Sequence, residues 1–137
     1  MAKALKTIHN KGIMHRDIKP ANIYIKKIDN SNERIIKLGD FGCSIYIKNN
    51  ISDSIGSILY SAPEMVQDLE YDEKIDLWSL GITLFELYFG NLPYGSDPNT
   101  NIMMNALYDE KNFYLNKHLK KEQSQKYLLL IYYLKDY

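Results

Sequence analysis

The chain has 137 residues, 45% of them hydrophobic and 25% charged, and its 17 basic and 17 acidic residues give a formal net charge of +0. This length fits one domain with a buried core, and the balanced charge favours neither nucleic acid nor an acidic membrane as a partner. The single cysteine, Cys43, excludes an internal disulfide framework and a multi-cysteine zinc site.

The first half of the chain predicts a helix followed by a β-hairpin. Residues 2–10 carry apolar side chains at helical spacing, and Gly12 follows as a natural stop. Two short apolar runs, residues 23–25 and 35–38, flank a polar turn at residues 29–32. A hairpin of this kind brings the residue before its first strand and the residue after its second strand to the same end.

The second half predicts a loop and then helices. Residues 43–60 contain serine, asparagine, glycine and aspartate without a sustained period, so we expect a mobile loop. Ser61 and Glu64 fit a capping box, with Ser61 as the N-cap of a short helix. Residues 73–89 predict a long helix that is apolar on nearly every side and central to the core, and residues 91–95 should end it.

The residues whose side chains could take part in a reaction lie close together in the sequence. Residues 15–22 read His-Arg-Asp-Ile-Lys-Pro-Ala-Asn, and Asp40-Phe41-Gly42 begins eighteen residues after Asn22. The stretch offers two carboxylates, an ammonium and a carboxamide, which are the groups that phosphoryl transfer needs. Taken alone, His-Arg-Asp could be a surface cluster of charges, and Asp-Phe-Gly could arise by chance.

In this order and spacing, the two motifs resemble the catalytic loop and the metal-binding turn of the eukaryotic protein kinases. Four further segments resemble the same family: Gly56-Ser57 with Tyr60, Ala62-Pro63-Glu64, Asp76-Leu77-Trp78-Ser79-Leu80-Gly81 and Leu92-Pro93-Tyr94.

The resemblance implies a role for each residue of the site. Asp17 would accept or orient the proton of the attacking hydroxyl, and Lys19 would lie against the phosphate of ATP that is transferred. Asn22 and Asp40 would hold Mg²⁺, a hard cation that prefers oxygen ligands. Tyr24 stands where the family usually places an aliphatic side chain beneath adenine, which would change the shape of the nucleotide pocket.

Other residues would support the site or face the substrate. The resemblance implies that Asp76 holds the backbone of the catalytic loop, and that His15 packs near Phe41 rather than acting as a base. His9 has no ligand-like partner in the sequence, and a surface or packing role is the default. Lys19 followed by proline implies serine and threonine acceptors, and so does Ser57, which would face the substrate together with Tyr60 and Glu64.

Regulation is suggested by Arg16 and the loop at Ser52, Asp53 and Ser54. In kinases activated on this loop, the arginine before the catalytic aspartate pairs with a phosphate. The usual phosphorylated position falls on Asp53, which would supply a weaker, permanent charge. The alternative is that any serine-rich loop shows such neighbours.

The sequence lacks the family's Gly-x-Gly-x-x-Gly loop and its Val-Ala-x-Lys strand. We therefore expect a mainly α (α+β) fold: the C-terminal lobe of a protein kinase with a small antiparallel β-element and without the N-terminal lobe. Two more helices are expected beyond about residue 99, the last over residues 127–134. The expected domain is a partial kinase domain over residues 1–137, with the catalytic loop at 15–22, the metal-binding turn at 40–42, the activation segment at 40–64 and the core helix at 73–89.

The expected function is that of a serine/threonine kinase using ATP and Mg²⁺ on protein substrates, weak or inactive as this fragment. The alternatives are a non-catalytic lobe that docks on substrates or on a kinase or regulatory protein, and an incomplete gene model. The N-terminus lacks the apolar core of a signal peptide, and the most apolar run, residues 77–89, is shorter than the roughly 20 residues that span a bilayer. We expect an intracellular, cytoplasmic protein, with a nuclear location also compatible, and no membrane partner.

Overall fold

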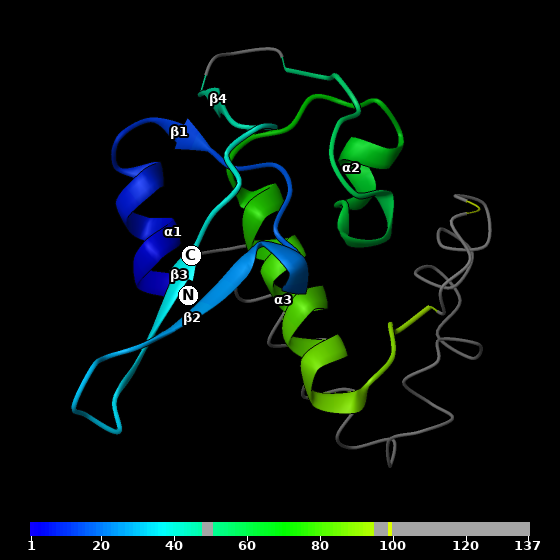
Figure 1. The fold of residues 1–137 in the computed structure, drawn as a ribbon. Helices are drawn as coiled ribbons and strands as arrows, with labels where there is room; N and C mark the ends of the chain where they lie inside the picture. The colour runs from blue at the N-terminus through cyan, green and yellow to red at the C-terminus, as the bar shows by residue number, and fades with distance from the viewer. Residues whose placement is uncertain (48–50, 95–98, 100–137) are drawn as a thin grey trace.

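The computed structural model describes residues 1–47, 51–94 and 99. Helix α3 runs through the middle of this part, with α1, the β2–β3 hairpin and α2 arranged around it (Figure 1). The elements in chain order are α1 (Ala2–His9), β1 (Ile13–Met14), η1 (Pro20–Asn22), β2 (Ile23–Lys27), β3 (Arg34–Leu38), β4 (Ile45–Tyr46), η2 (Ile58–Tyr60), α2 (Pro63–Val66) and α3 (Lys74–Phe89). None of the helices in the described ranges is long and apolar enough to cross a membrane.

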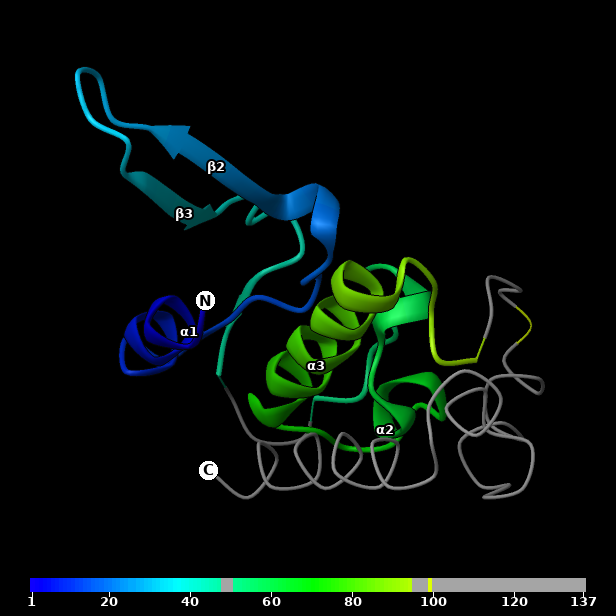
Figure 2. The ribbon, with the colours of Figure 1, turned by 90° about the horizontal axis from the view of Figure 1, so that it is seen from below.

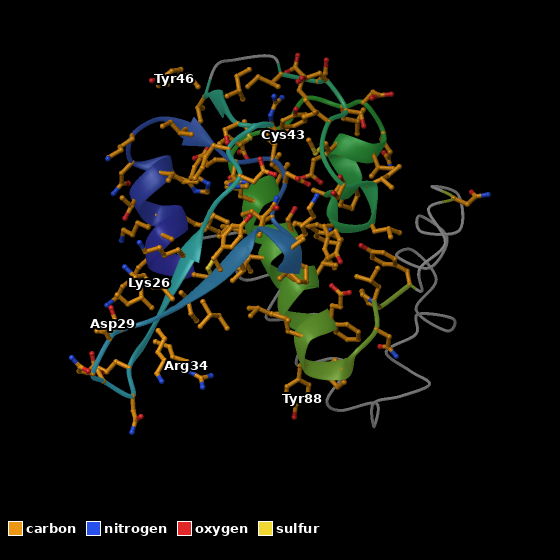
Figure 3. All side chains as sticks on the ribbon, viewed as in Figure 1. Lys26, Asp29, Arg34, Cys43, Tyr46 and Tyr88 are labelled. Atoms are coloured by element: carbon orange, nitrogen blue, oxygen red, sulfur yellow. The ribbon has the colours of Figure 1, made fainter. Side chains whose placement is uncertain are left out.

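Helix α3 is the predicted core helix, and it starts within one residue of the predicted position. Gly90 ends it in the left-handed conformation at φ 75°, and the Gly90 N–H donates to the Glu86 carbonyl at 2.8 Å. The helix therefore ends at Phe89, as predicted, with Gly90 as its C-cap, because glycine adopts positive φ without a Cβ penalty. Although it is apolar on nearly every side, the helix is not buried on every side, since Leu87 and Tyr88, the latter labelled in Figure 3, are exposed.

Among the residues that the structure describes, the core consists of three apolar clusters, and α3 contributes to all of them. Its residues Ile75, Leu80 and Ile82 each belong to a different cluster. Trp78 packs against two of the three. The other buried members are Met14, Ile51, Ala62, Met65 and Tyr71 in the first cluster, Leu92 and Tyr94 in the second, and Leu5 and Ile18 in the third.

The N-terminal helix and the hairpin form as the sequence predicts. Helix α1 ends at His9, and the chain then turns through Gly12 at φ 69°. Strands β2 and β3 pair antiparallel, with Ile23 opposite Leu38 at the base. Most side chains of the two strands are exposed, and the hairpin extends away from α3 and α2 (Figure 2).

The stretch at residues 43–60 contains more regular structure than expected. Strand β4 pairs with β1, Ile51 forms a β-bridge with Tyr71, and residues 58–60 form the 3₁₀ turn η2. Pairings of one or two residues are too short to leave a period in the sequence, which is why the prediction of a loop alone was wrong here. The mobility of this stretch stays a prediction.

The predicted capping box is wrong. Ala62, not Ser61, is the N-cap residue of α2, and no side chain caps this helix. Pro63 occupies the first helical position, where its fixed φ suits the first turn, and this shifts the cap one residue along the chain. The Ser61 hydroxyl instead donates to the Ser57 carbonyl at 3.2 Å. The two helices expected beyond residue 99 lie outside the described residues.

Candidate active site

The carboxylate of Asp76 holds the start of the 15–22 loop. Asp76 lies in the first turn of α3 and is fully buried. Its two oxygens accept hydrogen bonds from the backbone N–H groups of His15 and Arg16, both at 2.8 Å. Arg16 has a φ of 67°, an unfavourable value for a residue with a side chain, so these two bonds stabilise a strained turn. The expected supporting role of Asp76 agrees with these contacts.

The sequence analysis did not predict that His9 also binds Asp76. The Nε2 atom of His9 lies 2.8 Å from Asp76 Oδ2, although the two residues are 67 positions apart. Local spacing carries no signal for such a pair, and the surface or packing role assigned to His9 by default missed it. The α1 helix is thereby connected to the carboxylate that supports the loop.

His15 packs beneath the loop, as expected. It is fully buried, and its ring meets Phe41 edge to face at a centroid distance of 4.8 Å. A carbonyl oxygen can only accept a hydrogen bond, so Nε2 of His15 donates to Gly39 O at 3.1 Å. Nδ1 accepts the Asp17 N–H at 3.3 Å. Both ring nitrogens therefore have a backbone hydrogen-bond partner.

Asp17 accepts hydrogen bonds from three sides. Its Oδ1 accepts the Ser57 N–H at 3.0 Å, while Oδ2 lies 2.9 Å from Lys19 Nζ and 3.0 Å from Asn22 Nδ2. Burial alone would raise the pKa of Asp17, but the hydrogen bonds from Lys19, Ser57 and Asn22 outweigh burial and lower the pKa below its usual value. The side chain is therefore a carboxylate at neutral pH, fixed in position and able to orient a hydroxyl.

Lys19 and Ser57 connect the loop to the later segment. The Lys19 ammonium donates to Ser57 Oγ at 2.7 Å. The residue before Ser57 must be glycine, because a Cβ at Gly56 would lie 2.3 Å from the Arg16 carbonyl oxygen and φ is 90°. The structure thus places Ser57, expected to face the substrate, directly against Asp17 and Lys19.

Asn22 and Asp40 lie at the same end of the hairpin, as predicted. The Gly39 N–H donates to the Asn22 carbonyl at 3.0 Å, which places the residue before β2 beside the residue before Asp40. Asn22 is buried and its Nδ2 donates to Asp17, while within the described residues its Oδ1 accepts no hydrogen bond. Asp40 is exposed, with one carboxylate oxygen 3.2 Å from the Gly42 N–H. An amide oxygen and an exposed carboxylate are donors that fit Mg²⁺.

Arg16 binds Asp53 and Tyr71. The guanidinium is buried, and its Nη1 donates to both carboxylate oxygens of Asp53 at 2.9 and 2.8 Å and to the Tyr71 hydroxyl at 3.1 Å. The Tyr71 hydroxyl donates to Asp53, and Arg16 Nε donates to the carbonyl of Cys43, labelled in Figure 3, at 2.7 Å. We call Arg16, Asp53 and Tyr71 the charge clasp.

The clasp affects the charge of its carboxylate. Desolvation raises the pKa of Asp53, but the hydrogen bonds from Arg16 and Tyr71 outweigh it and lower the pKa below its usual value. Ser52 and Ser54, the other predicted regulatory residues, are exposed beside it. Tyr71 was missed because its position in the sequence, 18 residues after Asp53, gives no local pattern.

The two residues predicted to face the substrate together with Ser57 lie on other elements. The Tyr60 hydroxyl donates to Glu86 of α3 at 2.7 Å, and burial together with Glu86 raises the pKa of Tyr60. The hydroxyl of Tyr60 is therefore hydrogen-bonded to α3, whereas the sequence led us to expect it on the substrate side. Glu64 lies half-buried in the first turn of α2.

Comparison with known proteins identifies relatives among the protein kinases. The family model described as "Protein kinase domain" matches residues 1–134. A serine/threonine-protein kinase ULK3 of Xenopus laevis is 42% identical over 98 residues, which is 70% of this chain and 20% of the relative. An Aurora kinase of Schizosaccharomyces pombe is 44% identical over 95 residues, 69% of this chain and 25% of the relative. The human serine/threonine-protein kinase ULK1 is 34% identical over 130 residues, 90% of this chain and 12% of the relative.

The chain thus spans a quarter or less of the length of these curated relatives. The family-model match covers nearly all of its 137 residues, including both motifs of the site. The chain belongs to the protein kinase domain family.

Proposed function

We propose that the chain is part of a serine/threonine protein kinase, which transfers the γ-phosphate of ATP to serine or threonine hydroxyls of proteins. The observation that carries this proposal is the Asp17 carboxylate, held by Lys19, Ser57 and Asn22 with a lowered pKa. Mg²⁺, when bound with ATP, supplies charge neutralisation for the phosphates. Asn22 and Asp40 would hold the metal.

In this proposal the residues of the chain position groups more than they take part in bond making. Asp17 accepts a hydrogen bond from the acceptor hydroxyl at a carboxylate oxygen and takes its proton as the bond from the hydroxyl oxygen to the γ-phosphorus forms. The bond between the γ-phosphorus and the β–γ bridging oxygen breaks in the same step, and ADP leaves. Lys19, held between Asp17 and Ser57, places a positive charge beside that oxygen. Ser57 fixes the later segment at the same point, so that a bound peptide would lie next to Asp17.

We further propose that residues 1–137 correspond to the C-terminal lobe of the kinase domain. The proposal is supported by the central helix α3, the two small antiparallel sheets and the two motifs of the site, which all belong to the described part of the chain. The groups that position the β- and γ-phosphates would come from elsewhere in a kinase domain, and such positioning supplies several kcal/mol of the barrier reduction. Phosphoryl transfer by these residues alone is therefore expected to be weak or absent.

The test is Mg²⁺-dependent binding of ATP, measured by calorimetry on the 137-residue chain. Saturable binding that Asp40→Ala abolishes is the expected result. Asp29→Ala, an exposed substitution at the hairpin turn labelled in Figure 3, is the matched control. A folded chain that binds no ATP with Mg²⁺ would refute the proposed nucleotide site.

A second candidate function is a non-catalytic lobe that docks on another protein. The observation in its favour is the exposure of large apolar side chains at the hairpin and the turn after it, namely Ile25, Ile36 and Phe41. ATP binding distinguishes the two candidate functions, because a docking lobe requires no nucleotide. Unchanged protein binding by Asp40→Ala, in a chain without ATP affinity, would favour it.

A further inference from the structure

Thr83 is a polar residue in the interior of α3, and it is fully buried. A hydroxyl within a helix commonly donates to the carbonyl four residues earlier, as Ser79 does to Ile75 at 3.1 Å. Thr83 Oγ1 instead lies 3.4 Å from the carbonyl oxygen of Ile18, 65 positions earlier in the chain. The bond is long, but buried hydroxyls are normally hydrogen-bonded, and a carbonyl oxygen can only accept. Thr83 is therefore the donor in a contact between α3 and the 15–22 loop.

Ile18 stands between Asp17 and Lys19, and it is itself fully buried. Its side chain belongs to the same apolar cluster as Leu80 of α3. The 15–22 loop passes beside α3 in both views of the ribbon (Figures 1 and 2). A hydrogen bond to the Ile18 carbonyl therefore holds the peptide group that joins Ile18 to Lys19.

Asp76, Leu80 and Thr83 form one stripe of α3, because residues three and four positions apart lie on the same face of a helix. Asp76 accepts the two N–H groups at the start of the loop, both at 2.8 Å. Thr83 lies seven residues further along α3 and donates to the loop at Ile18. Asp17 lies between these two points, so α3 holds the backbone on both sides of it.

We propose that Thr83 is a positioning residue for the Asp17 carboxylate, because its hydroxyl fixes the backbone between Asp17 and Lys19. As a statement about phosphoryl transfer, this inference rests on the proposed function. Thr83 acts only through the Ile18 carbonyl, and it touches neither the carboxylate nor a substrate. The Ser57 N–H reports the position of the carboxylate, because it donates to Asp17 Oδ1 at 3.0 Å.

The test is NMR on the 137-residue chain with Thr83→Val, which keeps the size of the side chain and removes the hydroxyl. The resonance of the Ile18 carbonyl carbon should shift, because it loses its donor. The Ser57 amide should exchange with deuterium about fivefold faster relative to the amides of α3, the factor that one net hydrogen bond contributes. The ratio matters, because a general loss of stability speeds up both sets of amides alike.

Two variants serve as controls. Thr83→Ser keeps the hydroxyl, so it should keep the Ile18 carbonyl resonance and the exchange ratio of Ser57 close to those of the unmodified chain. Thr7→Val removes a hydroxyl that donates within its own helix, to the Lys3 carbonyl at 2.8 Å, and it should change neither signal.

Unchanged signals in a folded Thr83→Val chain would overturn the inference. Equal effects of Thr83→Val and Thr83→Ser would also overturn it, because they would arise from packing and not from the hydroxyl. If Thr83→Val does not fold, the unmodified chain decides. A buried, bonded Thr83 hydroxyl proton exchanges slowly enough to give its own NMR signal, and the absence of that signal would refute the bond to Ile18.

The calorimetry with Mg²⁺ and ATP separates this inference from the proposed function, because the NMR signals need no nucleotide. If Thr83→Val has the expected effects but the folded chain binds no ATP, the positioning of Asp17 stands and the proposed function fails. If the chain binds ATP and Thr83→Val changes neither signal, the nucleotide site stands and the role of Thr83 is refuted.

Discussion

Replacing Asp53 by asparagine removes the negative charge from the charge clasp and keeps the size of the side chain. The Arg16 guanidinium, 7% exposed as a residue, then keeps the Tyr71 hydroxyl and the Cys43 carbonyl but loses its only carboxylate among the described residues. The Asp53 side chain is 57% exposed, so water screens part of the interaction. Exposed ion pairs contribute up to about 1 kcal/mol, and breaking a buried pair costs about 3 to 5 kcal/mol.

Because one partner is buried and the other exposed, we expect Asp53→Asn to lower the free energy of unfolding by about 1 to 2 kcal/mol. Urea denaturation of the two chains measures this difference. Limited proteolysis should also show faster cleavage near residues 52–55, since the clasp fixes this stretch. Asp53→Glu should lose less, and Ser54→Asn is the control on the neighbouring exposed position.

The pH dependence has a definite sign. The folded-state pKa of Asp53 is lowered, so its contribution to stability is fully present above the unfolded-state pKa and is lost as the pH falls through the folded-state value. The stability difference between the protein and Asp53→Asn should therefore be constant near neutral pH and shrink in acid, below the ordinary aspartate pKa. An equal unfolding free energy for both chains at pH 7, or a difference that persists in acid, would refute the reasoning.

Substitutions test three further features, with Gly90→Ala as a control for one of them. Asp76→Asn leaves one backbone N–H of the strained turn without its carboxylate acceptor, and we expect a loss of about 3 kcal/mol in urea denaturation; a loss below about 1 kcal/mol would contradict the supporting role. Gly56→Ala places a methyl group 2.3 Å from the Arg16 carbonyl oxygen, so the midpoint of thermal unfolding should fall by several degrees. Gly90→Ala is the control, because a methyl group there meets open space and the substitution tests the cost of positive φ alone. Tyr60→Phe removes the hydroxyl bound to Glu86 and should cost about 1 kcal/mol, and an unchanged midpoint would show that this bond is not stabilising.

The sequence was sufficient to predict those features that depend on residues close together in the chain. The 15–22 loop and the 40–42 turn were found from residue types and spacing. The hairpin was predicted from two short apolar runs around a polar turn, and α3 from its density of apolar residues. The support of the loop by Asp76 and the packing of His15 on Phe41 came from the family resemblance, and the structure contains both contacts.

What the sequence could not provide are contacts between residues far apart in the chain. His9 with Asp76, and Tyr71 with Arg16, join side chains whose local surroundings carry no trace of their partner. The capping box failed for a different reason: the motif fitted by residue type, but Pro63 determined where the helix begins. The placement of the exposed Tyr24 ring of β2 beside Gly39 depends on a side-chain conformation, which no pattern of residue types encodes.

The sharing of α3 by all three apolar clusters has a consequence for how the molecule opens. No cluster can separate from α3 without exposing apolar surface, and Asp76 on the same helix holds the amides of His15 and Arg16. These two amide protons should therefore exchange with deuterium only when the whole core unfolds. Amides of the outer hairpin, where both strands are exposed, should exchange through small local openings. The candidate site and the folding core of the described residues are then one cooperative unit, joined by α3.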